Sequence, residues 1–492
     1  MNQRLPLTLL LCIYLVLETS CHKPIPNPSY EMIGNSGHFP YIEAQNELVS
    51  IINDFIITSP EEVQINASTD IQKIDIFPFQ SQHVHGSTLV ELSDGSLLAA
   101  WFQGSGERQA DDVAIYGARY QLGADQWSEA FLMADVPGFP DTNPVLFVDP
   151  QERLWLMWYT VLANQWESSL LKYRISEDYL SAGSPKWAWQ EVIHVKAGGS
   201  TEQGIQADDR FVLAVKNKFA EYYDYLETSG MFEQLPTKVE QDSLRNLFHA
   251  RVSALVALAG GSDMMARGTT TDQAGNRIGQ QMGYPRFRRL GWQTRNRPLS
   301  LPSGRMIVPL YSDGFDFSLM AITDDGGQHW LFSEPLVSIG GVQPALLLRK
   351  DGTIFSLMRD NGPPPQRLLM SQSNDQGMSW SPVVDSDIPN SGAAAEMLAL
   401  SDGRWLLVHN GTEEGRYALE VSLSEDEGVS WKTALQIEYD RTKVARAHYP
   451  SVVQDQTGKI HLLYSYHTRS AEAQAAKTIR HASFWLEDFV KK

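Results

Sequence analysis

The stretch that decides the fold is SNDQGMSW, residues Ser373 to Trp380. Nearly the same stretch occurs twice more, as TDDGGQHW from Thr323 to Trp330 and as SEDEGVSW from Ser424 to Trp431. The starts of the three copies are 50 and 51 residues apart. A repeat of this length is typical of one four-stranded blade of a β-propeller, so the stretch predicts a repeated β architecture.

The residue types in this stretch describe a turn. Ser and Asp side chains bond to nearby backbone groups, and Gly adopts the positive φ that other residues avoid. Trp places a large ring back against the blade and buries it. None of these roles needs a substrate, so we expect the repeat to be structural rather than catalytic.

A second pattern runs in phase with the first. An apolar run, a polar turn and a second apolar run recur along the chain, and Asp-Gly or Ser-Gly dipeptides in the turns predict β-hairpins. The six copies are LVELSDGSLLAAW, VLFVDPQERLWLMWY, LSLPSGRMIVPLY, LLLRKDGTIFSLMR, LALSDGRWLLVHN and VVQDQTGKIHLLYSY. They predict an all-β, six-bladed β-propeller over residues 71–490. The segment IDIFPF, Ile74 to Phe79, is expected to supply the strand that closes the last blade.

One interval breaks the rhythm and predicts a helical insertion at residues 197–285. The second hairpin, near Glu152, lies about 150 residues before the third at Gly304, where one blade needs about a third of that. Apolar residues at helical spacing predict a first helix that Gly230 ends, with a stripe of Phe211, Val215, Phe219, Tyr222 and Leu226. A capping-box pair begins a second helix, whose residues are Thr237, Glu240, Leu244, Phe248, Val252 and Leu255. Both stripes are expected to pack in a core.

The N-terminus predicts export. One Arg precedes an apolar run, 7–17, that is too short to span a bilayer and has the layout of a signal peptide over residues 1–21. Ser20 and Thr19 suit a lipidation site at Cys21, whereas Glu18 does not, so the sequence leaves lipidation open. Residues 22–70 are polar and predict a linker. We expect a periplasmic, outer-membrane-anchored or secreted protein that touches a membrane only through such a lipid.

Charge and cysteine content exclude some classes of function. The net charge of −19 argues against nucleic acid or an anionic membrane surface as the main partner. Of the two cysteines, Cys12 lies inside the signal, so the mature protein has at most one cysteine, Cys21, and neither an internal disulfide nor a cysteine-based metal site is expected. No cofactor is indicated.

The three repeats resemble the Asp-box, or BNR repeat, of the sialidase (neuraminidase) superfamily. The layout from HGSTLVELSDGSLLAAWFQG to YPSVVQDQTGKIHLLYSYH is similar to the catalytic domain of that group, over residues 72–485 apart from the insertion. The resemblance implies a six-bladed propeller with its active site at the mouth of the central channel. It also implies an exo-acting glycoside hydrolase for a terminal acidic sugar. In that group three Arg hold a carboxylate, a Tyr assisted by a Glu is the nucleophile, and an Asp is the acid/base.

This set of residues has a clear chemical logic. A guanidinium binds a carboxylate bidentately. A neutral Tyr avoids the repulsion that a carboxylate nucleophile would meet beside the sugar's own carboxylate.

The resemblance assigns roles to particular residues. Tyr449, at the start of RAHYPSVVQ, matches the nucleophile, and Arg416 matches the third clamp residue. Arg367 approximates the second, with Arg359 as its rival. The acid/base is expected in the loop FQGSGERQADDVAIY, whose candidates are Asp111, Asp112 and Glu107, with the Asp pair preferred.

Two positions depart from the group. The first clamp Arg is replaced in HVHGSTLVEL, which has His83 and His85, and the assisting Glu is replaced in IGGVQPALL, where Gln343 is the prominent polar residue. The two His lie on one side of a strand, but no third ligand has a telling spacing, so we expect His85 to be an acid/base or a sugar ligand rather than part of a metal site. Further candidates for sugar contacts are Gln103, Asn143, Trp158, Tyr159, Asn296, Arg297, Asn410 and Tyr466.

Two other functions stay open. A polysaccharide lyase or hydrolase acting on uronic-acid or rhamnose glycans would use His and Tyr as acid and base, which suits His85. A non-catalytic glycan-binding propeller would explain the departures, because a fold does not determine a function.

Overall fold

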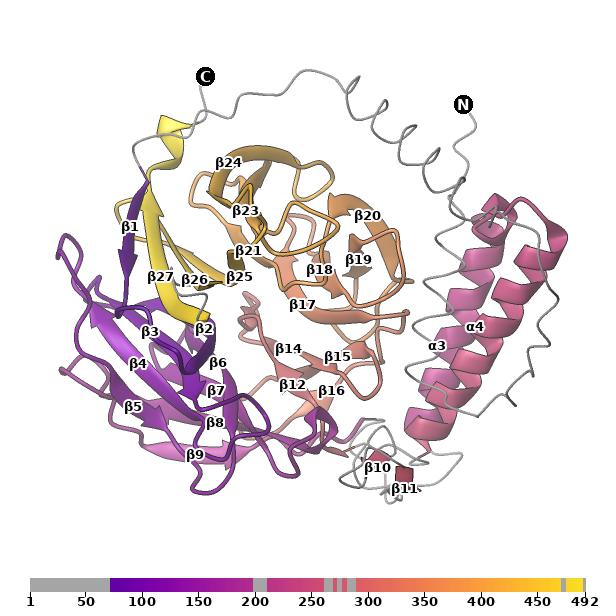
Figure 1. Ribbon diagram of the computed structural model, residues 1–492, viewed down its shortest axis with the longest axis horizontal. Helices are drawn as coiled ribbons and strands as arrows, with labels where there is room; N and C mark the ends of the chain where they lie inside the picture. The colour runs from indigo at the N-terminus through magenta and orange to yellow at the C-terminus, as the bar shows by residue number, and fades with distance from the viewer. Residues whose placement is uncertain are drawn as a thin grey trace, which may run out of the picture.

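The computed structural model describes residues 71–197, 210–260, 269–271, 277–280, 289–469 and 475–489. Within this part of the chain, six antiparallel sheets surround a common axis as the blades of a propeller (Figure 1). The predicted signal peptide, Cys21 and the predicted linker lie outside the described residues. The six-bladed all-β fold predicted from the hairpins is therefore confirmed.

The blades follow one another along the chain. Blade 1 contains β2 (His83–Glu91), β3 (Leu97–Gly104), β4 (Ala114–Tyr120) and β5 (Phe131–Ala134), and blade 2 contains β6 (Asp141–Val148), β7 (Leu154–Val161), β8 (Ser169–Ser176) and β9 (Trp189–Val192). Blade 3 contains β12 (Gln293–Thr294), β13 (Leu299–Ser300), β14 (Met306–Ser312), β15 (Phe317–Thr323) and β16 (Leu331–Phe332). Its innermost strand is split, because β12 and β13 both pair with β14.

The remaining blades complete the ring. Blade 4 contains β17 (Gly341–Leu348), β18 (Ile354–Asp360), β19 (Arg367–Ser373) and β20 (Val384–Pro389), and blade 5 contains β21 (Glu396–Ala399), β22 (Trp405–His409), β23 (Ala418–Ser424) and β24 (Lys432–Tyr439). Blade 6 contains β25 (Arg446–Gln454), β26 (Ile460–Arg469), β27 (Ala475–Phe484) and β1 (Gln72–Asp75).

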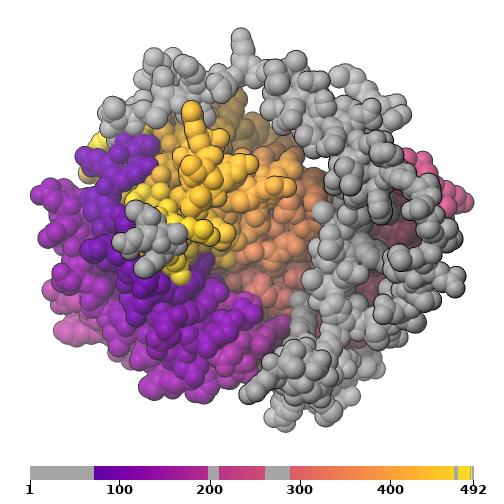
Figure 2. All heavy atoms as spheres, in the orientation of Figure 1, coloured from indigo at the N-terminus to yellow at the C-terminus, as the bar shows by residue number. Residues whose placement is uncertain are grey.

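The ring closes by strand pairing between the two ends of the described chain. β1 pairs antiparallel with β27, and the guanidinium of Arg480 lies 2.7 Å from the carboxylate of Asp75. Figure 2 shows the indigo and yellow ends of the chain side by side at this junction. The predicted closing strand is confirmed, although it begins at Gln72 and ends at Asp75, before the Pro of IDIFPF. This pairing covers the edge of β27 and makes β1 the fourth strand of blade 6.

Each Asp-box is a hydrogen-bonded turn between the third and fourth strands of its blade. In the middle copy, Ser373 Oγ donates to Asp375 and accepts from the N–H of Gly377, at 2.8 and 2.9 Å. Asp375 also accepts from the backbone N–H and the hydroxyl of Ser379. The ring of Trp380 is buried in the core. The residues of this turn therefore have the structural role that their types predict.

The boxes also join each blade to the preceding one. In blades 3, 4 and 5 the box glycine has a positive φ, and a Cβ there would come within 3.0 Å of a side chain of the preceding blade, namely Trp155, Ile307 or Phe355. An Arg of that preceding blade donates to the carbonyl next to the glycine, and the pairs are Arg153 with Gly326, Arg305 with Gln376 and Arg349 with Glu427. Only glycine combines this backbone with so close an approach.

The insertion forms two helices, which lie side by side at the outside of the ring (Figure 1). α3 (Arg210–Thr228) buries Phe211, Val215, Phe219 and Leu226, and Phe211 and Phe219 pack against Phe315 and Phe317 of blade 3. α4 (Lys238–Ala259) begins with the predicted capping box of Thr237 and Glu240. A short hairpin of β10 (Thr269–Thr271) and β11 (Arg277–Gln280) follows.

The predicted stripes are therefore core-facing. Gly230 has φ +71° and ends the first helix, as predicted. Neither helix of the described chain has the length and apolar composition that a membrane span requires.

Replacement of Asp426 by Ala tests the structural role of the box. Asp426 accepts from Ser424 Oγ, Ser430 N and Ser430 Oγ at 2.6–2.8 Å, and the bond from the Ser430 hydroxyl contributes most to a pKa of about 2. We expect Asp426→Ala to lower the free energy of unfolding by about 1 kcal/mol at neutral pH, measured by urea titration.

The pH dependence has a definite sign. A carboxyl group whose pKa is lowered on folding stabilises the protein above its unfolded pKa of about 4, and this contribution fades as the pH falls toward about 2. The difference between wild type and Asp426→Ala should shrink over that range. Glu425→Ala, in the same turn, is the matched control and should change stability little. Equal losses in the two variants at neutral pH would contradict the assigned role.

Candidate active site at the first strands of the blades

Four first strands carry the same backbone distortion. The pairing register shifts in β2, β6, β17 and β25, and the residue in each shift has a positive φ. These residues are Gly86, Asn143, Gln343 and Tyr449, with φ values of 65°, 46°, 56° and 58°. A bulge turns a side chain out of the ladder, and a positive φ at a residue other than Gly is uncommon and costs about 1–3 kcal/mol. Such strain is typical of functional sites.

A sequence signal accompanies these bulges. Pro follows the distorted residue in Asn143-Pro144, Gln343-Pro344 and Tyr449-Pro450. Pro has no N–H to donate to the ladder, which suits a strand at a bulge. An X-Pro dipeptide in the first strand of several blades therefore marks the residues that point toward the axis.

Side chains from four blades form one hydrogen-bonded chain at the axis. Tyr449 Oη accepts from Gln343 Nε2 at 3.2 Å, and the same amide nitrogen lies 3.2 Å from Tyr311 Oη. Asn143 Nδ2 donates to Tyr159 at 2.7 Å and lies 3.4 Å from the Tyr311 hydroxyl. All five residues are buried. The predicted nucleophile thus belongs to a network that also holds the predicted Asn143, Tyr159 and Gln343.

Three guanidinium groups surround Tyr449. Arg359 Nη1 donates to Tyr449 Oη at 2.9 Å, and the guanidinium carbons of Arg295 and Arg416 lie 5.0 and 5.6 Å from the centre of the phenol ring. Burial lowers the pKa of Arg295 and of Arg416, yet an Arg stays charged at neutral pH. Positive charge is therefore concentrated around Tyr449, although the whole chain has a net charge of −19.

The structure separates the two rivals for the second clamp position. Arg359 bonds to Tyr449, whereas Arg367 Nη1 lies 2.5 Å from the exposed carboxylate of Glu413. The preference for Arg367 therefore has no support in the geometry, because its position at the start of β19 directs it to the blade 5 loop. Arg295, which the sequence did not single out, is the third guanidinium.

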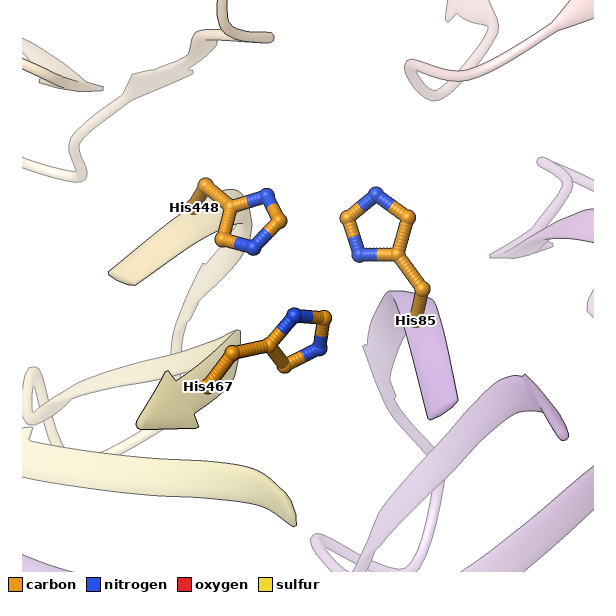
Figure 3. A group of neighbouring side chains, drawn as sticks. All are labelled: His85, His448 and His467. Atoms are coloured by element: carbon orange, nitrogen blue, oxygen red, sulfur yellow. The ribbon is translucent and has the colours of Figure 1, made fainter. Parts of the chain in front are cut away.

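Three histidines lie beside Tyr449 (Figure 3). The ring of His85 is 4.1 Å from that of Tyr449 and 4.6 Å from that of His448, and His467 is 4.8 Å from His448, all between ring centres. Burial lowers the pKa of His467 to about 4 and holds the pKa of His85 and of His448 well below the usual range. The three rings are therefore uncharged at neutral pH.

This histidine cluster, His85, His448 and His467, could not be read from spacing. His83 was the expected neighbour of His85, but the partners come from β25 and β26 in blade 6. Ring closure brings blade 6 against blade 1, which places residues more than 360 positions apart in contact.

The acidic loop of blade 1 offers a different residue from the one preferred on sequence. Asp111 and Asp112 are exposed, and Asp112 accepts from the N–H and the hydroxyl of Ser105, whose hydroxyl bond lowers its pKa. Glu107 instead lies 3.9 Å from His83 Nε2. Burial raises the pKa of Glu107, while Arg108 and then Arg416 oppose that effect. Glu107 is thus the member of this loop that faces the site.

Other predicted contacts have structural partners. Asn410 Nδ2 donates to the carbonyls of Ala418 and Ala447, and Gln103 bonds to Gln82 at 3.0 Å. Trp158, Asn296 and Arg297 are held by Asp141, the carbonyl of Gln343 and Glu396, respectively. Tyr466 lies under the guanidinium of Arg480, at 3.9 Å. The side chains of these residues are thus engaged in contacts within the protein.

Comparison with known proteins agrees with this architecture. A family model described as a BNR repeat-like domain matches residues 95–242 and 289–462. Among solved structures, a protein of unknown function from Dyadobacter fermentans has 13% identity and a TM-score of 0.51, over 85% of this chain and 99% of that one. A Hadza microbial sialidase has 14% identity and a TM-score of 0.52, over 83% and 66% of the two chains.

A second sialidase of known structure has a similar degree of likeness to this chain. Trypanosoma rangeli sialidase has 12% identity and a TM-score of 0.52, over 84% of this chain and 59% of its own. This chain thus spans about two thirds or less of these two sialidases. No curated protein sequence matches it. The structural likenesses show the fold, and the family model covers well over half of the residues. The chain therefore belongs to the BNR repeat-like domain family and has the sialidase-like six-bladed propeller fold.

Proposed function

We propose that this protein is an exported glycan-active enzyme that removes a terminal acidic sugar by sialidase-type exo-glycoside hydrolysis. The observation that carries the proposal is the group of three guanidiniums around one phenol, with Arg359 Nη1 2.9 Å from Tyr449 Oη. Export rests on the signal-like N-terminus. Structural neighbours that are sialidases support the class of substrate.

The geometry suits the following reaction. Arg359 and Arg416 bind the carboxylate of the sugar. Tyr449 Oη attacks the anomeric carbon and passes its proton to water as the bond to the leaving oxygen breaks. Glu107 donates its proton to that oxygen, for which a raised pKa is an advantage. Water then attacks the glycosyl–tyrosine bond while Glu107 takes up one of its protons, and the released phenol oxygen regains a proton from water, so the sugar is released with retained configuration.

Gln343 takes the place of the assisting carboxylate. An amide cannot accept the phenol proton as a carboxylate does, but its N–H and that of Arg359 both point at Tyr449 Oη. Two donors and three nearby positive charges stabilise negative charge on the phenol oxygen as it reacts. This arrangement activates the nucleophile by electrostatics in place of a base.

The first test removes the nucleophile. We expect Tyr449→Phe to lower kcat for release of sialic acid from a fluorogenic sialoside by about 10³-fold or more, because the phenol oxygen forms the covalent bond. Tyr439→Phe is the matched control, since Tyr439 is exposed on the outer strand of blade 5, and it should retain wild-type rates. Full activity in Tyr449→Phe would exclude the mechanism.

A second test separates the acidic residues of the blade 1 loop. Glu107→Gln should slow cleavage of a natural sialoside by about 10²–10⁴-fold and slow an aryl sialoside less, because a good leaving group needs little protonation. Asp112→Asn, whose carboxylate only braces Ser105, should stay within a few-fold of wild type on both substrates. The opposite ranking would assign the acid to Asp112.

A third test compares two arginines. Arg359→Gln should reduce kcat/KM by about 10²-fold, since a charge-assisted bond to substrate is lost and the contact with Tyr449 changes. Arg367→Gln should have little effect, because Arg367 pairs with the exposed Glu413. A larger loss of kcat/KM for Arg367→Gln than for Arg359→Gln would show that the substrate carboxylate binds at Arg367.

One observation favours a second candidate. His85 lies 4.1 Å from Tyr449, and a neutral His beside a Tyr suits acid and base roles in a polysaccharide lyase for uronic-acid glycans, with the same arginines neutralising the uronate. A lyase product absorbs ultraviolet light through its new double bond, and a hydrolase product does not. Glycan binding without either product would point to a binding propeller.

A further inference from the structure

The histidine cluster has no role in the proposed sialidase-type hydrolysis. His85 comes from β2, His448 from β25 and His467 from β26, and the three rings turn a nitrogen toward one space (Figure 3). Among the described residues, these nitrogens lie within 4.8 Å of one another. His85 and His448 are buried and His467 is half-buried.

Second contacts hold these rings in place. His467 Nε2 donates to the carbonyl of Val84 at 2.8 Å, which leaves the lone pair on its Nδ1. His85 Nδ1 lies 2.8 Å from Ser465 Oγ, and the Gly86 N–H donates to the same oxygen. Histidines that bind metals are commonly oriented as His467 is, by an acceptor on the far side of the ring.

His448 has an unused nitrogen. The residue is only 4% exposed to solvent, and its Nε2 makes no hydrogen bond to the described part of the protein. A buried polar atom without a partner costs about 1–3 kcal/mol, so it calls for an explanation. Nε2 faces the other two rings, and a ligand in that space would satisfy it.

We propose that His85, His448 and His467 form an open three-histidine site for a divalent transition metal of the zinc class. Imidazole suits zinc, nickel and copper, and three protein ligands leave a coordination position for water or substrate. The rings are neutral, which is the form that binds a metal. The site goes beyond the proposed hydrolysis and stands whether or not Tyr449 is a nucleophile.

Arg416 opposes this site directly. Its Nη1 donates to His448 Nδ1 at 3.0 Å, which puts the ring proton on Nε2. Metal binding through Nε2 needs that proton on Nδ1, where it would meet the guanidinium N–H. Arg416 also adds a positive charge close to the cation. Binding of a metal and the contact between Arg416 and His448 therefore exclude each other.

The competition predicts an unusual variant. Arg416→Gln removes the charge and supplies a carbonyl oxygen that can accept from His448 Nδ1–H. We expect this substitution to tighten metal binding by about tenfold or more, on the scale at which second contacts tune metal sites.

The experiment uses the untagged full chain, freed of metal by chelation and dialysis. Titration with Co²⁺ should show one equivalent bound, with the visible absorption of a low-coordinate ion, and Zn²⁺ should displace it. His85→Gln, His448→Gln and His467→Gln should each weaken binding by about tenfold or more. His194→Ala, an exposed histidine, is the control and should bind as the wild type does. Circular dichroism confirms folding in each variant.

Three outcomes would overturn the proposal. They are absence of binding by the folded wild type, binding that persists in the three variants, and binding that Arg416→Gln weakens. Sialidase turnover takes no part in this readout, so failure here leaves the proposed hydrolysis untouched. Conversely, inactivity toward sialosides with intact Co²⁺ binding would remove the proposed function and keep the metal site.

Discussion

The contact between each Asp-box and the preceding blade is the interaction on which the ring depends. A four-stranded blade buries its faces only against its neighbours, so the junctions decide whether six sheets form one protein. At three junctions the chain uses the same device, a box glycine without a side chain packed on an apolar residue of the preceding blade. An Arg from that blade bonds to the adjacent carbonyl, as Arg349 does to Glu427. Together with the pairing of β1 and β27, these junctions hold the six blades in one ring.

That rigidity permits strain at the centre. Asn143, Gln343 and Tyr449 adopt positive φ values at bulges, each before a Pro, and such backbone persists only where the surroundings determine it. The result is a set of polar side chains that leave the ladder and meet at the axis. The outer ends of the blades provide stability and the inner ends carry the polar groups, so the conspicuous repeat and the chemistry lie apart.

The centre of the ring is positively charged, whereas the chain as a whole is negatively charged. Arg295, Arg359 and Arg416 gather around Tyr449 in a protein of net charge −19, while burial keeps the neighbouring histidines uncharged. Positive charge concentrated in this way favours the binding of a ligand that carries a carboxylate. The same neutrality makes the histidine cluster a competent set of metal ligands, and Arg416 is the residue that links the two.

Local patterns in the sequence were enough for the architecture, because turn chemistry and hairpin alternation act within a few residues. The number of blades, the helical insertion, the closing strand and the structural role of the boxes all follow from such patterns. The resemblance to the sialidase superfamily, applied in phase with the repeat, suggested Tyr449, Arg416 and Gln343 as candidates. The choice of Arg359 over Arg367, the third guanidinium of Arg295, the inward position of Glu107 and the partners of His85 came only from the tertiary structure. These features depend on which side chains the different blades direct to the axis. Ring closure brings together residues that are far apart along the chain, and their spacing in the sequence does not indicate the contact.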